Sequence, residues 1–466
     1  MNLDRLKTWD IESKYPVENI TLNNNEVWPY LRELLIVHLS YQQFPVNISS
    51  FKLFSTLSRL GNIVFGLKNW FKSVHTVCFS FNINLSLFNG NYVDRYIGGV
   101  VASPDKNALV IEYATSRHLP MSKRVFKQVC SFSLINSLAF ILSKVYFLFS
   151  SLKGKEVLNK ICEEYKISKK KKKQIIKKLV HFHCRYILYR WVFKIKKIKE
   201  IVCTCHYQVL PEIKAAKELG LKVTEFQHGI IDQYHVSFMR KKQVSLSFLP
   251  DQLLVFGDKV KKNFTDKAHF IAQENIHVVG NYFIDLVKNN TVKNKLLSEL
   301  RAQYEKIIVV PSISNFEKEM ISFTVNSAKI DQGIAYLYFP RVISTDVRKW
   351  LNNDPQSNVY LLEDLSFYDC LSIADFHSTT FSTTAIEAPS FGVTTIAMVL
   401  DCHKKDVHPK DHFESIIPEG LIEYVESPEA FVEKIRTKEV PDRTWVINKN
   451  ETNYFENYSG AINQYI

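Results

Sequence analysis

The stretch Lys222-Val-Thr-Glu-Phe-Gln-His-Gly-Ile-Ile-Asp-Gln-Tyr-His235 decides how this chain folds. Its start, Lys222–Phe226, predicts a buried strand, and Gly229 predicts the turn that follows it. Carboxylate, amide and imidazole side chains crowd this turn. Open α/β sheets place their ligands where the backbone leaves a parallel strand, so the turn is a candidate site. A strand–helix connection whose histidines only cap or pack is the competing interpretation.

Strands and helices alternate in both directions from this stretch. The first series has predicted strands at 201–205, 222–226, 253–256 and 276–279, and a helix at 210–219 that ends at Gly220. Strands are also expected at 81–85 and 108–113. A polar helix at 289–304 then leads to a second series of strands at 306–310, 334–339, 358–362, 373–376 and 394–399. Such alternation implies βαβ units and parallel sheets.

The predicted fold class is therefore α/β, with two Rossmann-like, doubly wound domains that face a central cleft. Residues 1–288 are expected to form the first domain, with a basic and apolar helical insertion at about 122–198. Residues 289–466 are expected to form the second. A chain of 466 residues is too long for one ordinary core, which agrees with this division.

Composition describes a globular protein, with 46% hydrophobic and 23% charged residues. Eight cysteines without a regular framework favour a reducing compartment. The first residues lack the apolar core of a signal peptide, so we expect a cytoplasmic protein. Phosphate loops of the Gly-x-Gly-x-x-Gly or Walker type are absent from the sequence, which argues against dinucleotide enzymes and P-loop kinases.

The net charge of +13 is concentrated around the unbroken run Lys169–Lys173 and the basic residues that follow it. Apolar residues recur there at helical spacing from 175 to 198, and the apolar stretch 129–151 lies just upstream. Asn136 and Lys144 interrupt that stretch, which is too short for a comfortable membrane span. We expect peripheral attachment to an anionic membrane, at about 1 kcal/mol per well-placed cation. Nucleic acid is the competing but less expected partner, and a solvated lysine face is the third interpretation.

A second polar segment, Asp375-Phe-His-Ser-Thr-Thr-Phe-Ser-Thr-Thr-Ala-Ile-Glu387, follows another predicted strand. Ser382 or Thr383 is placed as a helix N-cap, and the N–H groups of such a terminus can bind phosphate. Glu387, one turn later, is placed to accept hydrogen bonds from sugar hydroxyls. A capping box between Thr384 and Glu387 is the alternative interpretation.

Several of these segments resemble bacterial surface-polysaccharide glycosyltransferases that build capsule and O-antigen and adopt the GT-B fold. The similar segments are 225–229 with the downstream His235, 249–257, and 382–387, with weaker similarity at 28–32 and 89–95. The chain departs from this family at two places. It has Phe339-Pro340-Arg341 where relatives have a His-Pro pair, and Pro311-Ser312 where several have Ser-Gln.

The resemblance implies transfer of a sugar from a nucleotide-sugar donor to a growing surface glycan or a lipid-linked glycan, without an essential metal or cofactor. His228 is the leading base candidate because imidazole titrates near working pH. The further base or orienting candidates are Glu225, Asp232 and His235. The expected donor-binding residues are Gln227, Gly229, Gly257, Ser312, Arg341, Thr380, Ser382, Thr383, Thr384 and Glu387.

Three other functions remain open at this stage. A polyol-phosphate transferase or a nucleotide-sugar 2-epimerase would use the same architecture. A non-enzymatic protein that binds membranes or nucleic acid would use only the lysine run. The segments 181–184 and 203–206 contain histidine and cysteine, but they lack the spaced pairs of a structural zinc site.

Overall fold

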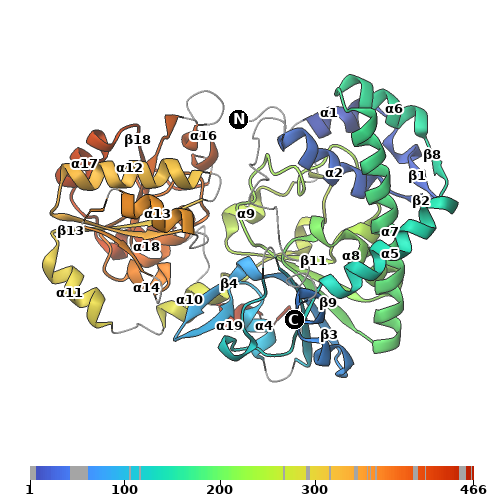
Figure 1. Cartoon of the computed structure of the whole chain (residues 1–466), viewed down its shortest axis with the longest axis horizontal. Coiled ribbons are helices and arrows are strands. Elements are labelled where there is room, and N and C mark those ends of the chain that lie inside the picture. Colours follow the sequence, from blue (N-terminus) through green and yellow to red (C-terminus); the bar gives the residue numbers. More distant parts are fainter. Residues whose placement is uncertain are drawn as a thin grey trace.

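The computed structural model describes residues 7–41, 61–103, 106–114, 117–265, 268–289, 294–313, 316–340, 345–353, 355–356, 358–362, 365–401, 408–414, 416–450, 458–462 and 464–465. Figure 1 shows two α/β lobes, one built mainly from the first half of the chain and one from the second. Each lobe contains one parallel sheet with helices on both faces. The predicted pair of doubly wound domains is therefore confirmed.

The first lobe is organised by a seven-stranded parallel sheet in the order β12-β11-β10-β9-β3-β6-β7. Its strands are β3 (Thr76–Phe81), β6 (Ala108–Tyr113), β7 (Val129–Ser131), β9 (Glu200–Cys203), β10 (Lys222–Phe226), β11 (Gln252–Val255) and β12 (Ile276–Val278). The chain winds outward from β3 in one direction and from β9 in the other. The strand order therefore reverses between β3 and β9, the point at which open α/β sheets form a ligand crevice.

The second lobe contains a six-stranded parallel sheet in the order β15-β14-β13-β16-β17-β18. Its strands are β13 (Lys306–Pro311), β14 (Ile334–Phe339), β15 (Val359–Leu361), β16 (Phe376–His377), β17 (Thr394–Met398) and β18 (Ile422–Val425). In this sheet the order reverses between β13 and β16. Each lobe thus has one predicted polar segment close to its own switch point, after β10 in the first and after β16 in the second.

Helices cover both faces of the two sheets (Figure 1). Those up to residue 288 are α1 (Lys7–Lys14), α2 (Trp28–Tyr41), α4 (Gly98–Ala102), α5 (Ser133–Phe149), α6 (Lys155–Glu164), α7 (Lys169–Lys196), α8 (Leu210–Glu218), α9 (Asp258–Lys262) and α10 (Tyr282–Lys288). The later ones are α11 (Lys295–Gln303), α12 (Glu317–Ile330), α13 (Thr345–Asn353), α14 (Phe367–Leu371), α15 (Thr384–Glu387), α16 (Pro409–Phe413), α17 (Pro428–Thr437), α18 (Arg443–Asn450) and α19 (Tyr458–Ile462). Short antiparallel pairings join β1 (Thr21–Leu22) to β2 (Asn25–Glu26) and β8 (Leu152–Lys153), and β4 (Leu85–Phe88) to β5 (Asn91–Asp94).

Most predicted strands lie within a residue or two of their expected places, and 222–226, 108–113 and 334–339 match β10, β6 and β14. The strand predicted at 81–85 is wrong. The central strand is β3, Thr76–Phe81, and every one of its residues is buried. Asn82–Asn84 form a 3₁₀ turn instead, because a central strand that packs on both faces is continuously buried and does not alternate with polar residues. The strand expected at 373–376 is also displaced, since β16 consists of Phe376–His377.

The segment expected as a helical insertion begins with the sheet itself, because β7 is the edge strand next to β6. The 28-residue helix α7 then packs along α5 on the outside of the first lobe (Figure 1). The N-cap Ser168 accepts a hydrogen bond from the Lys171 backbone, which explains why a run of lysines can begin this helix. Among the described residues, no helix combines the length and the apolar character needed to span a membrane.

The end of the chain returns to the first lobe (Figure 1). The Tyr458 backbone donates to Asp285, and a Cβ on Gly99 would lie 2.5 Å from the Tyr458 ring. Lys222 and Gln252 both donate to the Tyr465 carbonyl oxygen. The boundary at 288/289 stays a prediction, but Tyr458 and Tyr465, which were expected in the second domain, contact the first lobe.

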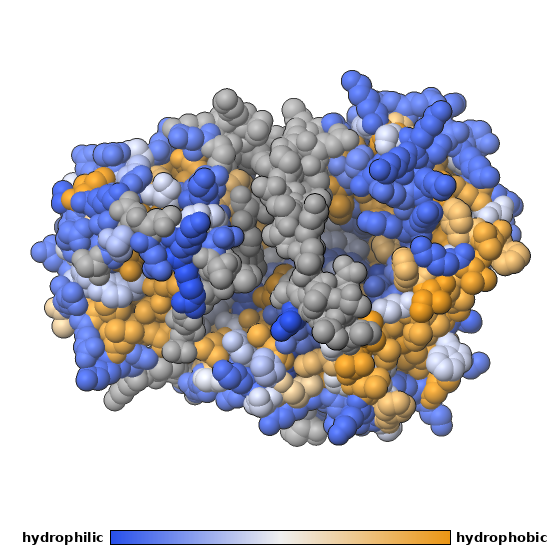
Figure 2. Space-filling view, in the orientation of Figure 1, coloured by the Kyte–Doolittle hydropathy of each residue, from blue (hydrophilic) through white to orange (hydrophobic). Residues whose placement is uncertain are grey.

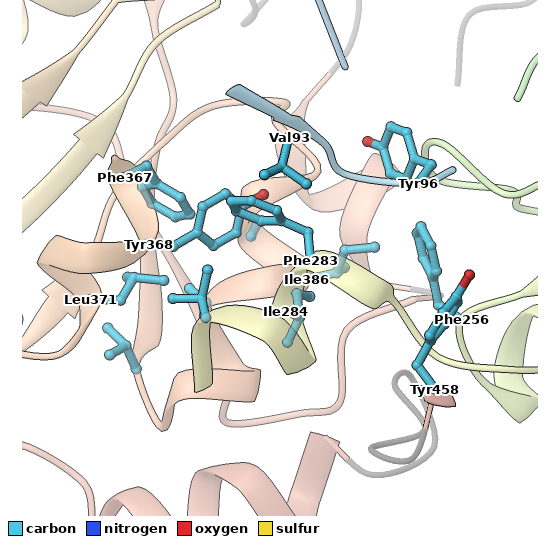
Figure 3. Close-up of a cluster of buried hydrophobic side chains, with 14 of the residues drawn as sticks. Val93, Tyr96, Phe256, Phe283, Ile284, Phe367, Tyr368, Leu371, Ile386 and Tyr458 are labelled. Atoms are coloured by element: carbon cyan, nitrogen blue, oxygen red, sulfur yellow. The ribbon is translucent and has the colours of Figure 1, made fainter. Parts of the chain in front are cut away.

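The two lobes share one hydrophobic cluster, shown in Figure 3. Phe283 on α10 meets the Tyr368 ring of α14 at a centroid distance of 5.0 Å. The residues labelled in Figure 3 are Val93, Tyr96, Phe256, Phe283, Ile284, Phe367, Tyr368, Leu371, Ile386 and Tyr458. Because this contact is apolar and buried, it fixes one lobe against the other at the base of the region between their switch points.

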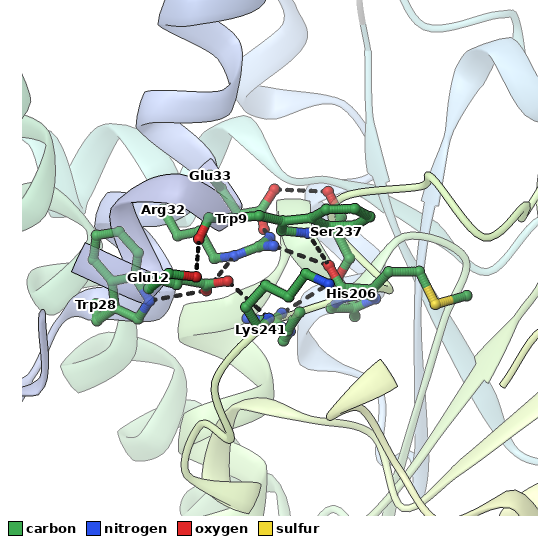
Figure 4. A network of polar contacts seen from close by, with 11 residues as sticks. Trp9, Glu12, Trp28, Arg32, Glu33, His206, Ser237 and Lys241 are labelled. Atoms are coloured by element: carbon green, nitrogen blue, oxygen red, sulfur yellow. Dashed lines mark hydrogen bonds and ion pairs between the residues drawn. The ribbon is translucent and has the colours of Figure 1, made fainter. Parts of the chain in front are cut away.

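A buried polar network ties the first two helices to the segment beyond the Gln-His-Gly turn (Figure 4). Arg32 on α2 donates to Glu12 on α1 over 2.8 Å, and both side chains are fully buried. Arg32 and Trp9 also donate to the Met239 carbonyl oxygen. Glu12 accepts from the Lys241 backbone in turn. The packing of α1 and α2 thus fixes the chain between 237 and 241.

We expect the substitution Arg32→Leu to lower the free energy of unfolding by about 3–5 kcal/mol, because it leaves the Glu12 carboxylate buried without its charged partner. Denaturant unfolding measures this loss. The matched control is Lys295→Ala, which removes the exposed Lys295–Glu299 pair and should leave stability unchanged. If the two variants were equally stable, the buried Arg32–Glu12 pair would not contribute to stability.

Candidate active site

His228 lies in the turn directly after β10, at the carboxyl edge of the first sheet. Its Nε2 is 3.2 Å from the Tyr207 hydroxyl, which comes from the loop after the neighbouring strand β9. Burial lowers the pKa of His228 to about 4, and the nearby Glu225 carboxylate opposes this shift only in part. The imidazole is therefore neutral near pH 7, the state in which it can accept a proton.

Glu225, predicted as an alternative base, has a different place. Its carboxylate is fully buried and accepts hydrogen bonds from the His206 backbone at 2.9 Å and from His206 Nδ1 at 2.9 and 3.1 Å. Successive side chains of a strand point to opposite faces of the sheet. The Glu225 side chain points into the protein, toward His206, and His228 lies in the turn that follows the strand. Glu225 is a positioning residue for the loop after β9.

His206 is a site residue that the sequence did not identify. Its Nδ1 faces the Glu225 carboxylate, and its Nε2 lies 3.2 Å from the Ser237 carbonyl oxygen. The Nδ1 contact ties the loop after β9 to the end of β10, and the Nε2 contact ties it to the segment at Ser237. His206 and Glu225 therefore form a fully buried, hydrogen-bonded contact. The only sequence signal is the Cys203-Thr-Cys-His206 cluster, which lacks the spaced pairs of a structural zinc site.

Gln227, predicted to bind the donor, is a structural residue. Its side chain is fully buried. The amide nitrogen donates to the Gly229 carbonyl at 2.8 Å, and the amide oxygen accepts from the Phe256 backbone at 2.8 Å. Both ends of the amide are therefore committed to the protein. Gln227 joins the turn after β10 to the loop after β11 and fixes the backbone on which His228 stands.

His235 and Asp232 lie further along the same loop. The His235 ring packs against Phe238 at 4.8 Å and against Tyr207 at 6.0 Å, so Tyr207 contacts both candidate histidines. Asp232 accepts a hydrogen bond from the Tyr234 backbone at 2.9 Å and forms a local turn. These two residues shape the loop around Tyr207 and remain partly exposed at its surface.

The hydroxyl-rich segment after β16 differs from its predicted form. Helix α15 has only four residues, and the Ser382 hydroxyl, at the position before the cap, accepts from the Thr384 backbone. The Thr383 side chain makes no capping hydrogen bond. The Thr384 hydroxyl meets Nε2 of the buried His377 at 3.0 Å. Because a helix of four residues has only a small dipole, its length does not support the phosphate site that was expected at its N-terminus.

The remaining predicted donor-binding positions are dispersed. The Ser312 hydroxyl donates to Glu317 at 2.7 Å, which ties the end of β13 to the start of α12. Thr380 is buried near the switch point of the second sheet. Gly257 precedes α9 in an extended conformation with φ −157°. Arg341 lies outside the described residues.

Glu387 is almost fully buried and contacts protein groups at the interface between the lobes. The Tyr368 hydroxyl donates to it at 2.7 Å, and Arg95 of the first lobe lies 3.2 Å from the Tyr368 hydroxyl. Burial is the main cause that lowers the pKa of His228, and the positive charge of Arg95 lowers it slightly further. Arg95 and Tyr368 were not predicted as site residues, although Arg95 ends the similar segment 89–95.

The two predicted segments meet across the lobes. A Cβ built on Gly229 would lie 3.9 Å from Cγ2 of Thr383, in ordinary van der Waals contact. A second contact nearby joins Lys259 on α9 to the Ile416 carbonyl of the other lobe. The carboxyl edges of both sheets thus place the His228–Tyr207 pair beside Thr383 and, at the same interface between the lobes, join Arg95 to Glu387 through Tyr368. Within the part of the chain that the structure describes, no group of three or more His, Cys, Asp or Glu side chains could hold a metal ion.

No protein-family model and no curated protein matches this chain. Among solved structures, the S. aureus MnaA–UDP co-structure is similar over 83% of this chain and 95% of that one, at 12% identity and a TM-score of 0.51. This similarity, with the two parallel sheets, shows the GT-B fold. Two further matches are the calicheamicin glycosyltransferase CalG4 (11% identity, 84% and 97% of the chains, TM-score 0.48) and the UDP-GlcNAc 2-epimerase of Neisseria meningitidis bound to UDP-GlcNAc (14%, 82% and 95%, 0.45).

His377 makes the stability of the fold around Thr384 sensitive to acid. Its two ring nitrogens meet the hydroxyls of Thr395 and Thr384, and burial lowers the pKa of His377 to about 3. The unfolded chain binds this proton near pH 6.5, so the stability contributed by the neutral ring is complete above about pH 6.5 and is lost as the pH falls toward 3.

We expect the free energy of unfolding to fall by up to about 3 kcal/mol per such histidine between pH 6.5 and 4. The variant His377→Gln, which keeps a hydrogen-bonding amide but cannot titrate, should show a smaller loss over this range. Denaturant unfolding at several pH values measures both slopes. Equal slopes for the variant and the unsubstituted protein would show that His377 is not neutral and buried.

Proposed function

We propose that this protein is a glycosyltransferase that moves a sugar from a nucleotide-sugar donor to a growing surface glycan of the capsule or O-antigen kind. The observation that carries the proposal is the approach of Gly229 to Thr383, which sets the His228 turn opposite the hydroxyl-rich segment of the second lobe. Both segments lie at the carboxyl edges of their sheets, where doubly wound folds bind ligands. The proposal rests on this geometry and on the motifs in the sequence.

In the proposed reaction His228 is the general base. It accepts the proton of the acceptor hydroxyl as that oxygen forms a bond to the donor sugar, and the bond from the sugar to the nucleotide phosphate breaks. Tyr207 holds the imidazole through its hydroxyl. The low pKa of His228 keeps the ring neutral, so it is ready to accept the proton.

The departing nucleotide carries negative charge, which needs a cation or N–H donors nearby. Arg95 and Lys259 are described cations at the interface of the lobes, and Arg95 is the one that holds Tyr368 next to Glu387. We propose that Arg95 stabilises the departing phosphate, in the place first considered for Arg341. The UDP named for the S. aureus structure supports a uridine nucleotide as the first donor to test.

The acceptor in this proposal is a glycan, free or linked to lipid, at the inner face of the cytoplasmic membrane, with Lys169–Lys173 as the expected membrane contact. A nucleotide-sugar 2-epimerase of the same architecture is the second candidate, because an epimerase bound to its nucleotide sugar is among the structural matches. The two functions differ in one requirement. An epimerase converts the donor alone, whereas the transferase needs an acceptor.

The direct test incubates the full chain with a panel of nucleotide sugars, each with and without a glycan acceptor. We expect release of the nucleotide that depends on the acceptor. Conversion of the donor sugar in the absence of an acceptor would assign the epimerase, and failure to bind or turn over any donor would exclude both enzymes.

We expect His228→Ala to lower kcat by about 100- to 10,000-fold, the usual contribution of a general base, with a smaller change in KM. The matched control is His75→Ala, which removes an exposed histidine far from β10 along the chain. Steady-state kinetics of both variants give the comparison. A rise in KM with an unchanged kcat would make His228 a binding residue and not the base.

The pH profile tests the same residue independently. A base with a pKa of about 4 keeps kcat/KM constant through neutral pH and places the acidic limb near pH 4. An ordinary imidazole would place that limb near pH 6.5. Measurement of kcat/KM between these values, with the fold checked at each pH, distinguishes the two. A limb near 6.5 would contradict the buried, neutral His228.

A further inference from the structure

Helix α5 carries an apolar face that no part of the described chain covers. Leu138, Ile141, Val145, Leu148 and Phe149 are 47%, 64%, 57%, 76% and 77% exposed. Their spacing of three and four residues places them on one side of the helix. Ile135, Ala139 and Ser143 are buried on the other side. The helix is anchored to the lobe by one face and presents the opposite, equally apolar face to the surroundings.

Figure 2 shows this face as a continuous hydrophobic stripe along α5, next to the hydrophilic surface above it. Scattered single apolar residues are normal on a protein surface, whereas a contiguous apolar stripe marks an interaction site. The five side chains named above define the α5 stripe.

A groove lies at the C-terminal end of α5, where Phe147 and Ser150 belong to its lining. The groove has a volume of about 340 Å³ and is lined by Leu22, Phe147, Ser150, Leu152, Lys155, Leu158, Asn159, Lys172 and Ile176. Its walls are largely apolar. Lys172 belongs to the lysine run and Lys155 begins α6, so two cations border the apolar groove.

Charge is concentrated in the same part of the chain. Residues 133–199 contain eighteen Lys and Arg but only three Glu, so this segment exceeds the net charge of +13 of the whole chain. No acidic residue occurs in the 28 residues of α7, which packs along α5. The apolar stripe and the positive charge therefore belong to one pair of helices.

We propose that the α5 stripe and the lysine-rich start of α7 dock on an anionic lipid bilayer, with α5 lying in the plane of the interface. Apolar side chains enter the acyl boundary while the lysines contact the headgroups. At 1.5 Å per residue the 17 residues of α5 extend about 25 Å, which suits a helix that lies on a membrane and does not cross it. This surface shares no residue with the candidate active site.

Charge complementarity selects the bilayer over a second copy of the chain. A symmetric dimer through the α5 stripe would bring two strongly basic segments together, and their like charges would repel. Nucleic acid would neutralise the lysines but would leave the apolar stripe in water. An anionic bilayer is the partner that satisfies both properties.

The test is co-sedimentation of the full chain with vesicles of phosphatidylcholine and phosphatidylglycerol in equal parts, compared with phosphatidylcholine alone. We expect binding to the anionic vesicles that weakens with salt. The variant Ile141→Ser/Leu148→Ser should lower the partition by about tenfold or more, since two inserted side chains are lost. Lys170→Gln/Lys173→Gln should weaken binding to the anionic vesicles and reduce its salt dependence.

The matched control is Leu296→Ser/Ile330→Ser, which removes two exposed apolar side chains from helices of the other lobe. Its vesicle binding should equal that of the unsubstituted chain. All substituted residues are exposed, so the thermal unfolding of these variants should be unchanged. Their turnover of soluble substrates should also be unchanged, so a failure of membrane binding can be told apart from a failure of the proposed function.

Three results would overturn the proposal. The first is absence of binding to anionic vesicles, and the second is equal binding by Ile141→Ser/Leu148→Ser. The third is a dimer in light scattering that this variant dissociates without any effect on vesicle binding, which would make a second copy the occupant. Binding to duplex DNA without binding to vesicles would likewise assign the lysines to nucleic acid.

Discussion

The buried hydrogen-bonded contact between Glu225 and His206 is the interaction on which the candidate site depends. It joins the last residues of β10 to the loop after β9, and His206 extends the connection to Ser237. Ser237 in turn donates to Glu33, beside the Arg32–Glu12 pair. Polar groups buried this deeply cost free energy unless they are hydrogen-bonded, so the whole chain of contacts has to form together.

The consequence for His228 is positional. Glu225 and Gln227 direct their side chains into the protein, and His228, the next residue along the chain, lies at the edge of the sheet. Tyr207 comes from the loop that His206 anchors, and its hydroxyl meets the imidazole. Glu225 and Gln227 therefore stabilise the turn, whereas His228 is the polar residue that the turn places at the candidate site. Burial then sets the charge state of His228.

The fold was largely predictable from the sequence because local rules and global packing agree in its strands. Buried β runs such as 222–226 and 334–339 alternate with amphipathic helices, and each is recognisable in isolation. The prediction at 81–85 was wrong because Asn82 and Asn84 interrupt the apolar run just where β3 has already ended. Similarly, the hydroxyl-rich segment near 382 was recognised, but the length of its helix was not, since tertiary contacts of Thr384 with His377 decide it.

The sequence alone determined the two parallel sheets, the polar turns that follow β10 and β16, and the concentration of positive charge before β9. These are local properties of composition and periodicity. Only the tertiary structure decided that Gly229 lies against Thr383, that Arg95 and Tyr368 join Glu387, and that His206 is paired with Glu225. Such contacts join residues up to hundreds of positions apart. Their formation depends on how the lobes pack and how much water that packing excludes, and no local pattern in the chain encodes either.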